Sequence, residues 1–86
     1  MPQVKKRRRN NERKFPDWDD LPDGGRRYRR RVPGRSGWSA VYEKVVDAQE
    51  NTLSFRQLIH DSSGRLVEVH EKFPRDLGHK KVETEQ

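Results

Sequence analysis

The sequence contains no cysteine, and only 28% of its 86 residues are hydrophobic. The lack of cysteine excludes disulfide bonds and cysteine-ligated zinc sites. The chain has no apolar run long enough to span a membrane, and its N-terminal cations are not followed by the apolar stretch of a signal peptide. We therefore expect a cytoplasmic protein with one small domain and little material for a core.

Positive charge is concentrated at the N-terminus. Residues 1–14 hold seven Lys and Arg side chains against the single acid Glu12, whereas the remaining residues carry equal numbers of cations and anions. Because like charges repel and apolar side chains are nearly absent, we expect residues 1–14 to form a disordered basic arm. Clustered cations attract polyanions, so the arm is predicted to contact nucleic acid. Its candidate contact residues are Lys5, Lys6, Arg7, Arg8 and Arg9.

Residues 15–25 combine aromatic and acidic side chains. Phe15, Trp18 and Leu21 recur every three residues among aspartates. Pro16 suits the first position of a helical turn, and acidic residues are favourable there. This segment is predicted to form one short helical turn that covers an apolar sheet face.

From residue 26 onward the pattern is typical of β-structure. Four runs are separated by turn-forming sequences of hairpin length. These runs comprise residues 26–32, 37–46, 52–61 and 65–73. Because no helical period separates them, residues 26–76 are predicted to form a mainly β domain, a four-stranded antiparallel meander. The polar residues 77–86 are expected to fray.

The turn lengths predict a register that places Ala40 opposite Ile59, Tyr28 opposite Tyr42 and Ile59 opposite Val67. This register collects the apolar side chains on one face of the sheet. The predicted apolar face comprises Tyr28, Val32, Trp38, Ala40, Tyr42, Val46, Leu53, Phe55, Ile59, Val67, Val69 and Phe73. An open sheet needs a cover on such a face. Where residues 15–25 are too small for this, a homodimer or another protein partner would complete the cover.

The opposite face of the predicted sheet is basic. Its candidate phosphate contacts are Arg27, Arg29, Arg31, Arg56 and Lys72. Arginine forks match phosphate oxygens, and each neutralised phosphate releases counterions. Because Trp38, Tyr42 and Phe55 are predicted to point to the apolar face, we expect contact with the backbone rather than base stacking. The sequence thus predicts a small non-catalytic protein that binds nucleic-acid backbone, RNA in preference to DNA.

Two other functions stay open. The predicted register puts Glu43, Arg56 and His70 in a row across three strands, where a metal-independent ribonuclease would use them as base, phosphorane-stabilising cation and acid. His60, beside Ser39, is a substitute acid. The simpler interpretation is a cross-strand salt bridge. The chain is alternatively a protein-interaction module, such as a toxin–antitoxin component or an assembly subunit. No cofactor is expected, and the histidine spacing does not predict a metal site.

The segment GRLVEVHEKFPRDLGHKKV (residues 64–82), together with PGRSGW (residues 33–38), resembles a group of short prokaryotic proteins of unknown function. The resemblance extends over residues 15–82. It implies a bacterial or archaeal cytoplasmic protein and no particular activity. No site residue is taken from it.

Overall fold

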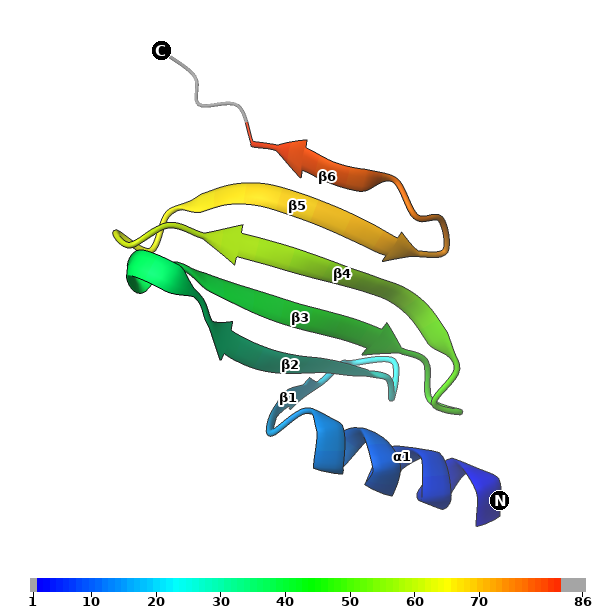
Figure 1. Ribbon diagram of the computed structural model, residues 1–86. Helices are drawn as coiled ribbons and strands as arrows, with labels where there is room; N and C mark the ends of the chain where they lie inside the picture. Colours follow the sequence, from blue (N-terminus) through cyan, green and yellow to red (C-terminus); the bar gives the residue numbers. More distant parts are fainter. Residues whose placement is uncertain (1, 83–86) are drawn as a thin grey trace.

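The computed structural model describes residues 2–82 as an antiparallel sheet of six strands with one helix. The strands follow one another across the sheet in chain order (Figure 1). The elements are helix α1 (Pro2–Lys14), strands β1 (Asp17–Asp20), β2 (Arg26–Pro33), β3 (Ser39–Val46), β4 (Thr52–His60), β5 (Leu66–Phe73) and β6 (Gly78–Lys81), and the short 3₁₀ helix η1 (Arg35–Gly37). The predicted mainly β antiparallel architecture is confirmed, whereas the predicted number of four strands is wrong.

The two additional strands are the polar edges of the sheet. In β1, Asp17 and Asp19 lie opposite Arg29 and Arg27 of β2, so opposite charges face each other across the strands. The predicted helical turn in residues 15–25 is therefore wrong. The expected fraying of residues 77–86 is wrong for residues 78–81, which form β6 along β5. Residues 83–86 lie outside the described residues.

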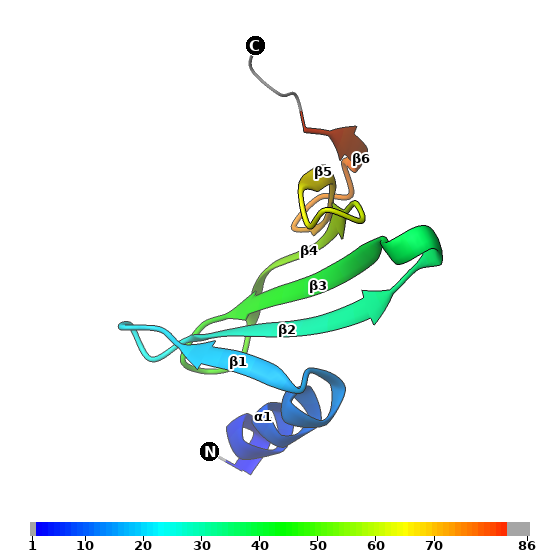
Figure 2. The ribbon, with the colours of Figure 1, turned by 90° about the vertical axis from the view of Figure 1, so that its left-hand side faces the viewer.

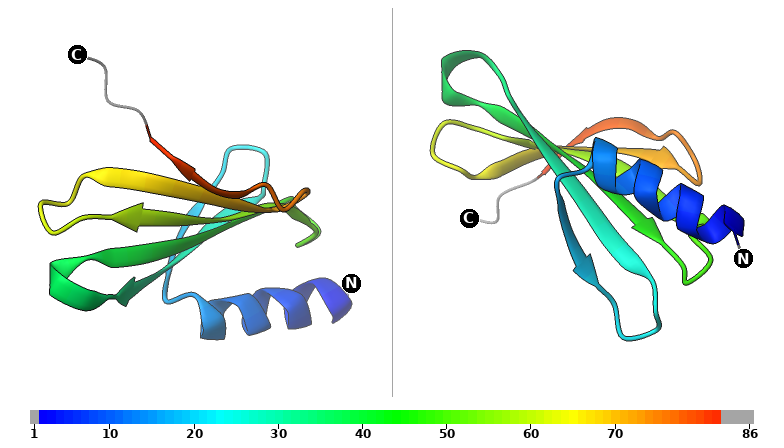
Figure 3. Two further views of the ribbon diagram at one scale, coloured as in Figure 1. Left: turned by 45° about the horizontal axis from the view of Figure 1, so that its top comes forward. Right: turned by 90° about the horizontal axis from the view of Figure 1, so that it is seen from below.

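The predicted disorder of the basic arm is wrong for residues 2–14, which form α1; Met1 lies outside the described residues. Lys and Arg are good helix formers, Pro2 suits the first helical position, and cations in the last turn favour the helix dipole. The helix lies against one face of the sheet, on the side of β1 to β3, while β5 and β6 lie far from it (Figures 2 and 3). Docking on the sheet offsets the repulsion that favours disorder.

The core lies where α1 meets the sheet. Its buried apolar side chains are Phe15, Tyr28 and Val46, with Tyr42 and Phe55 packed against them. Phe15 directly follows the helix, and its backbone N–H donates to the Asn11 carbonyl at 2.8 Å. The last turn of α1 therefore inserts an aromatic ring between the helix and the strands. This core is small, as the hydrophobic content predicts.

The sheet has two faces of different chemistry. The helix face, against which α1 packs, carries Tyr28, Lys44 and Phe55, and the outer face carries Arg27 and Glu43. In β2 to β4 this division agrees with the predicted alternation. The predicted pairing of Ala40 with Ile59 is confirmed. The predicted pairing of Ile59 with Val67 is wrong, because Ile59 lies opposite Glu68.

The register of β2 against β3 is offset from the prediction by two residues. Tyr28 lies opposite Lys44, and Tyr42 lies opposite Arg30. The connection is longer than predicted because η1 inserts a turn, in which Trp38 is 41% exposed. An offset of two residues keeps each side chain on its predicted face.

The register of residues 68–71 in β5 differs from the prediction by one residue, and this exchanges the faces of these residues. Two β-bulges place extra residues in β5, at Val67 and at Lys72, so Gln57 pairs with His70 and Leu58 pairs with Val69. The predicted positions of Val69 on the apolar face and His70 on the basic face are therefore wrong. A third bulge, in β4, leaves Leu53 50% exposed.

Candidate nucleic-acid interface

The buried carboxylate of Glu50 fixes α1 to the sheet. Glu50 lies in the β3–β4 turn with φ of 64°, and it is 4% exposed. One carboxylate oxygen, Oε1, accepts hydrogen bonds from the Tyr28 hydroxyl at 2.6 Å and from Asn11 Nδ2 at 3.1 Å. The other, Oε2, accepts from Arg8 Nε at 3.1 Å. Burial and the neighbouring Glu50 raise the pKa of Tyr28 to about 12.

The side chains of α1 divide into a docked row and an exposed row. Arg8, Asn11, Glu12 and Phe15 follow helical spacing and contact the sheet or its turns. Glu12 accepts a hydrogen bond from Arg26 at 2.8 Å, so the single acid of the helix is neutralised by the sheet. The exposed cations are Lys5, Lys6, Arg7, Arg9, Arg13 and Lys14, of which Arg7 also donates to Asn51 in the β3–β4 turn. Four of the five predicted arm contacts are thus exposed, and the fifth, Arg8, is a docking residue.

The arginines of the outer face are largely paired with carboxylates. Arg29 Nη2 lies 2.8 Å from Asp19, and Arg56 Nε lies 2.7 Å from Glu43. Arg27 Nε lies 3.9 Å from the same Glu43. Arg31 is exposed. On the predicted basic face, most arginines are therefore paired with carboxylates. This leaves α1 as the more cationic surface.

The proposed ribonuclease row does not assemble. Glu43 and Arg56 pair as predicted, but Glu71, rather than His70, lies opposite Arg56. The bulge at Val67 turns His70 to the helix face, where its Nε2 lies 2.6 Å from Asp76. A general base and a general acid on opposite faces of one sheet cannot act on the same phosphodiester.

The other two histidines, His60 and His79, do not pair with Glu43 or Arg56. The predicted neighbour pair of His60 and Ser39 is confirmed. His79 lies opposite His70 on β6, with ring centroids 4.4 Å apart.

Lys72 lies on the helix face and not on the outer face as predicted. Its Nζ is 5.3 Å from the ring centroid of Tyr42 and 5.9 Å from that of Phe55. The cause is again a bulge, because Lys72 is the extra residue between the pairs formed by Glu71 and Phe73. Lys72 is thereby a cation held over aromatic rings.

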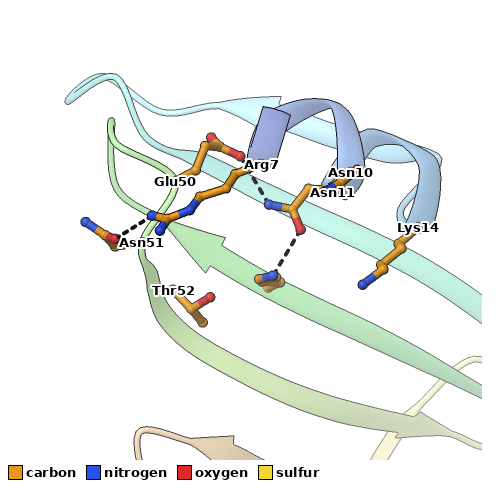
Figure 4. Close-up of a pocket in the computed structure, with 8 residues that line it drawn as sticks. Arg7, Asn10, Asn11, Lys14, Glu50, Asn51 and Thr52 are labelled. Atoms are coloured by element: carbon orange, nitrogen blue, oxygen red, sulfur yellow. Dashed lines mark hydrogen bonds between the residues drawn. The ribbon is translucent and has the colours of Figure 1, made fainter. Parts of the chain in front are cut away.

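A polar cleft of about 420 Å³ lies between α1 and the β3–β4 hairpin (Figure 4). Its walls include three cations, Arg7, Lys14 and Lys44. Arg7 donates to Asn51 Oδ1 at 3.2 Å, and Lys44 Nζ donates to Asn11 Oδ1 at 2.9 Å. Burial and the neighbouring charge of Lys14 lower the pKa of Lys44. The one acid in the walls, Glu50, already accepts hydrogen bonds from Arg8, Asn11 and Tyr28. With three cations against one carboxylate, the cleft carries a net positive charge that suits an anion.

Two further hollows continue along the helix face. One of about 410 Å³ is lined by Lys14, Lys44, Phe55 and Phe73, and one of about 310 Å³ by Lys14, Phe55 and Tyr42, among other residues. Tyr42 and Phe55 stack with ring centroids 6.2 Å apart. Sequence reasoning placed these aromatic rings on an apolar face that residues 15–25 or a protein partner would cover, and it did not predict the hollows. The available signal was that residues 15–25 hold too little apolar material to cover the whole face.

Comparison with protein-family models, with curated proteins and with solved structures finds no match to this chain. Among the described residues, no helix combines the length and the apolar character needed to cross a bilayer.

Proposed function

We propose that this protein binds nucleic acid through the phosphate backbone, using the exposed cations of α1. The observation that carries the proposal is the helix itself: six cations are exposed on it, and its one carboxylate is bonded to Arg26. A rigid helix holds these charges at a fixed spacing, which a disordered arm does not. The preference for RNA over DNA stays a prediction.

Electrostatic repulsion within α1 supports this function. Lys5 and Arg9, and Arg9 and Arg13, stand four residues apart on the exposed side, where like charges destabilise a helix. A polyanion along this side relieves the repulsion and releases counterions. Binding of a phosphate backbone would therefore remove an electrostatic repulsion that is present in the free protein.

The test is a salt titration of binding with charge-reversed variants of the full chain. The variant Lys6→Glu/Arg9→Glu/Arg13→Glu is expected to bind a fluorescent 20-nucleotide RNA or DNA strand at least tenfold more weakly. It also lowers the slope of log K against log salt by about 2, since each lost phosphate contact on a single strand removes ~0.7. Glu is a good helix former and reduces the repulsion, so α1 should persist.

The matched control reverses three exposed arginines outside α1, Arg35, Arg65 and Arg75. Its net charge equals that of the helix variant. If the proposal is correct, the control keeps most of the affinity and slope. Equal losses in both variants would reduce the effect to overall charge and contradict a role for α1.

A second function, a protein-interaction module, is favoured by the apolar side chains that the fold leaves in solvent. Leu53, Phe73 and Leu77 are 50%, 44% and 47% exposed. A second copy of the chain or another protein would remove them from water. Light scattering across a hundredfold range of protein concentration tests the homodimer: a constant monomer mass argues against it.

A further inference from the structure

The hollows on the helix face adjoin one another. The polar cleft and the larger aromatic hollow share Lys14, Lys44 and Thr52 in their walls. The two aromatic hollows share Lys14, Phe15 and Phe55. The three together form one groove along α1, hereafter the helix-face groove, with a polar end and an aromatic end.

The two ends of the groove match the two halves of a nucleotide. Arg7, Lys14 and Lys44 present cationic donors at the polar end, which suits a phosphate. Tyr42 and Phe55 present aromatic rings at the other end, which suits a base. We propose that the helix-face groove binds a single strand of nucleic acid, with a phosphate at the polar end and a base against the aromatic rings.

The groove favours a single strand because the bases of a duplex are paired and stacked. An unpaired base can be splayed out and placed on an aromatic ring, and any of the four bases offers a π-face. Each hollow, at about 310 and 410 Å³, has the size of a pocket for a small organic group. A duplex would meet only the exposed cations of α1.

Two cations already lie over the aromatic end. Lys72 Nζ is 5.3 Å from the Tyr42 ring centroid, and Arg30 lies 5.7 Å from the same centroid. Both are long side chains whose heads reach solvent. In the free protein they cover the ring faces. When a base takes their place, both cations stand beside it, where the flanking phosphates of a strand lie.

This inference rests on the proposed function and extends it. The exposed cations of α1 attract any polyanion, whereas the groove supplies a preference for unpaired strands. Arg7 and Lys14 belong to both sets, whereas Lys6, Arg9 and Arg13 are exposed cations of α1 that do not line the groove. Separate variants therefore change one without the other.

The experiment measures the affinity of the full chain for a 12-nucleotide strand and for the 12-base-pair duplex of the same sequence. Phe55→Leu is expected to weaken binding of the strand about tenfold and binding of the duplex less than twofold. Trp38→Leu, which removes an exposed aromatic ring outside the groove, is the matched control. Lys44→Gln is paired with Lys80→Gln, an equal charge change on the exposed part of β6.

A measurement on the unmodified protein guards against a variant that fails to fold. Ultraviolet cross-linking of a strand containing 4-thiouridine is expected to join the peptide that holds Tyr42 or Phe55. Cross-links confined to Trp18 or Trp38 would overturn the groove as the base site. Uridine monophosphate binding as tightly as the strand would also overturn it, because the site would then serve a free nucleotide.

The outcomes separate the two proposals. In one outcome, the protein binds strand and duplex equally, reversal of the α1 cations abolishes binding, and Phe55→Leu and Lys44→Gln leave it unchanged. This outcome overturns the groove as a binding site and keeps the proposed function. Absence of binding to both nucleic acids removes both. A strand preference that Phe55→Leu and Lys44→Gln abolish supports both.

Discussion

The Tyr28 hydroxyl donates a hydrogen bond of 2.6 Å to the Glu50 carboxylate, and both side chains are buried beneath α1. Tyr28 belongs to β2 and Glu50 to the β3–β4 turn. Because Asn11 and Arg8 bond to the same carboxylate, Glu50 joins the helix, one strand and one turn. The walls of the helix-face groove therefore depend on an acid that lies in a turn.

The substitution Glu50→Gln tests this junction. Gln keeps the length of the side chain but replaces one acceptor oxygen by a donor, which leaves Arg8, Asn11 or Tyr28 without a partner. We expect a loss of about 1–3 kcal/mol in the free energy of unfolding. Urea denaturation measures it. The neighbouring exposed Gln49→Ala serves as control and should stay within about 0.5 kcal/mol. Equal stability of Glu50→Gln and the parent chain would contradict the role of Glu50.

Alkaline pH is expected to destabilise the fold through Tyr28. Its pKa is about 12 in the folded chain, against 10.0 for an unperturbed tyrosine, because burial and then Glu50 disfavour the phenolate. The folded state therefore holds the proton more tightly. The raised pKa of Tyr28 contributes roughly 2–3 kcal/mol to the free energy of unfolding. This contribution is complete below pH 10 and is lost as the pH rises from 10 through 12. Melting temperatures measured across this range should fall, and Tyr28→Phe should flatten the decline.

The sequence predicted the centre of the sheet better than its edges. In β3 and β4, most side chains on the helix face are apolar, with Lys44 and Gln57 as exceptions, so the pairing of Ala40 with Ile59 follows from alternation. Strands β1 and β6 are polar apart from Trp18, and without an apolar stripe they are held mainly by pairing with their neighbours. A bulge adds one residue without a sequence signature, and so Lys72 and His70 were placed on the wrong face.

The sequence predicted the positive charge of the candidate site, but it did not predict that this charge lies on a helix docked against the sheet. The cations of residues 5–9 follow from composition alone. Composition also predicted disorder, because like charges repel and residues 1–14 hold almost no apolar side chains. Only the spacing of Arg8, Asn11 and Phe15 on one helical face indicated otherwise. The partner of that row, Glu50, is a charged turn residue, and burial of such a residue cannot be read from a sequence.

Two carboxylates of the outer face should differ strongly in their effect on stability. The Asp19 side chain is 59% exposed beside Arg29, whereas that of Glu43 is 10% exposed and lies within 4 Å of both Arg27 and Arg56. An exposed ion pair contributes about 0.2–1 kcal/mol. Removal of a buried charged acceptor costs about 1–3 kcal/mol. Urea denaturation should therefore show that Glu43→Gln is less stable than Asp19→Asn. The reverse order would contradict the role of Glu43 as the shared partner of Arg27 and Arg56.

The turn that joins β1 to β2 leaves no room for a side chain at Gly25. A Cβ atom there would lie 2.3 Å from the carbonyl oxygen of the buried Val46, and backbone atoms cannot rotate away. Gly64 has φ of 88° but nothing within 4 Å of such an atom, so its substitution costs only the strain of a left-handed conformation, about 1–2 kcal/mol.

We therefore expect Gly25→Ala to destabilise the fold more than Gly64→Ala does, as measured by urea denaturation. Gly25→Ala must displace either β1 or the end of β3. Val46 packs with Phe15 and Tyr28, so movement of β3 there also loosens the last turn of α1. The helical circular-dichroism signal should consequently fall in Gly25→Ala and persist in Gly64→Ala. Equal stability and equal helical signal in the two variants would show that the β1–β2 turn does not support the docked helix.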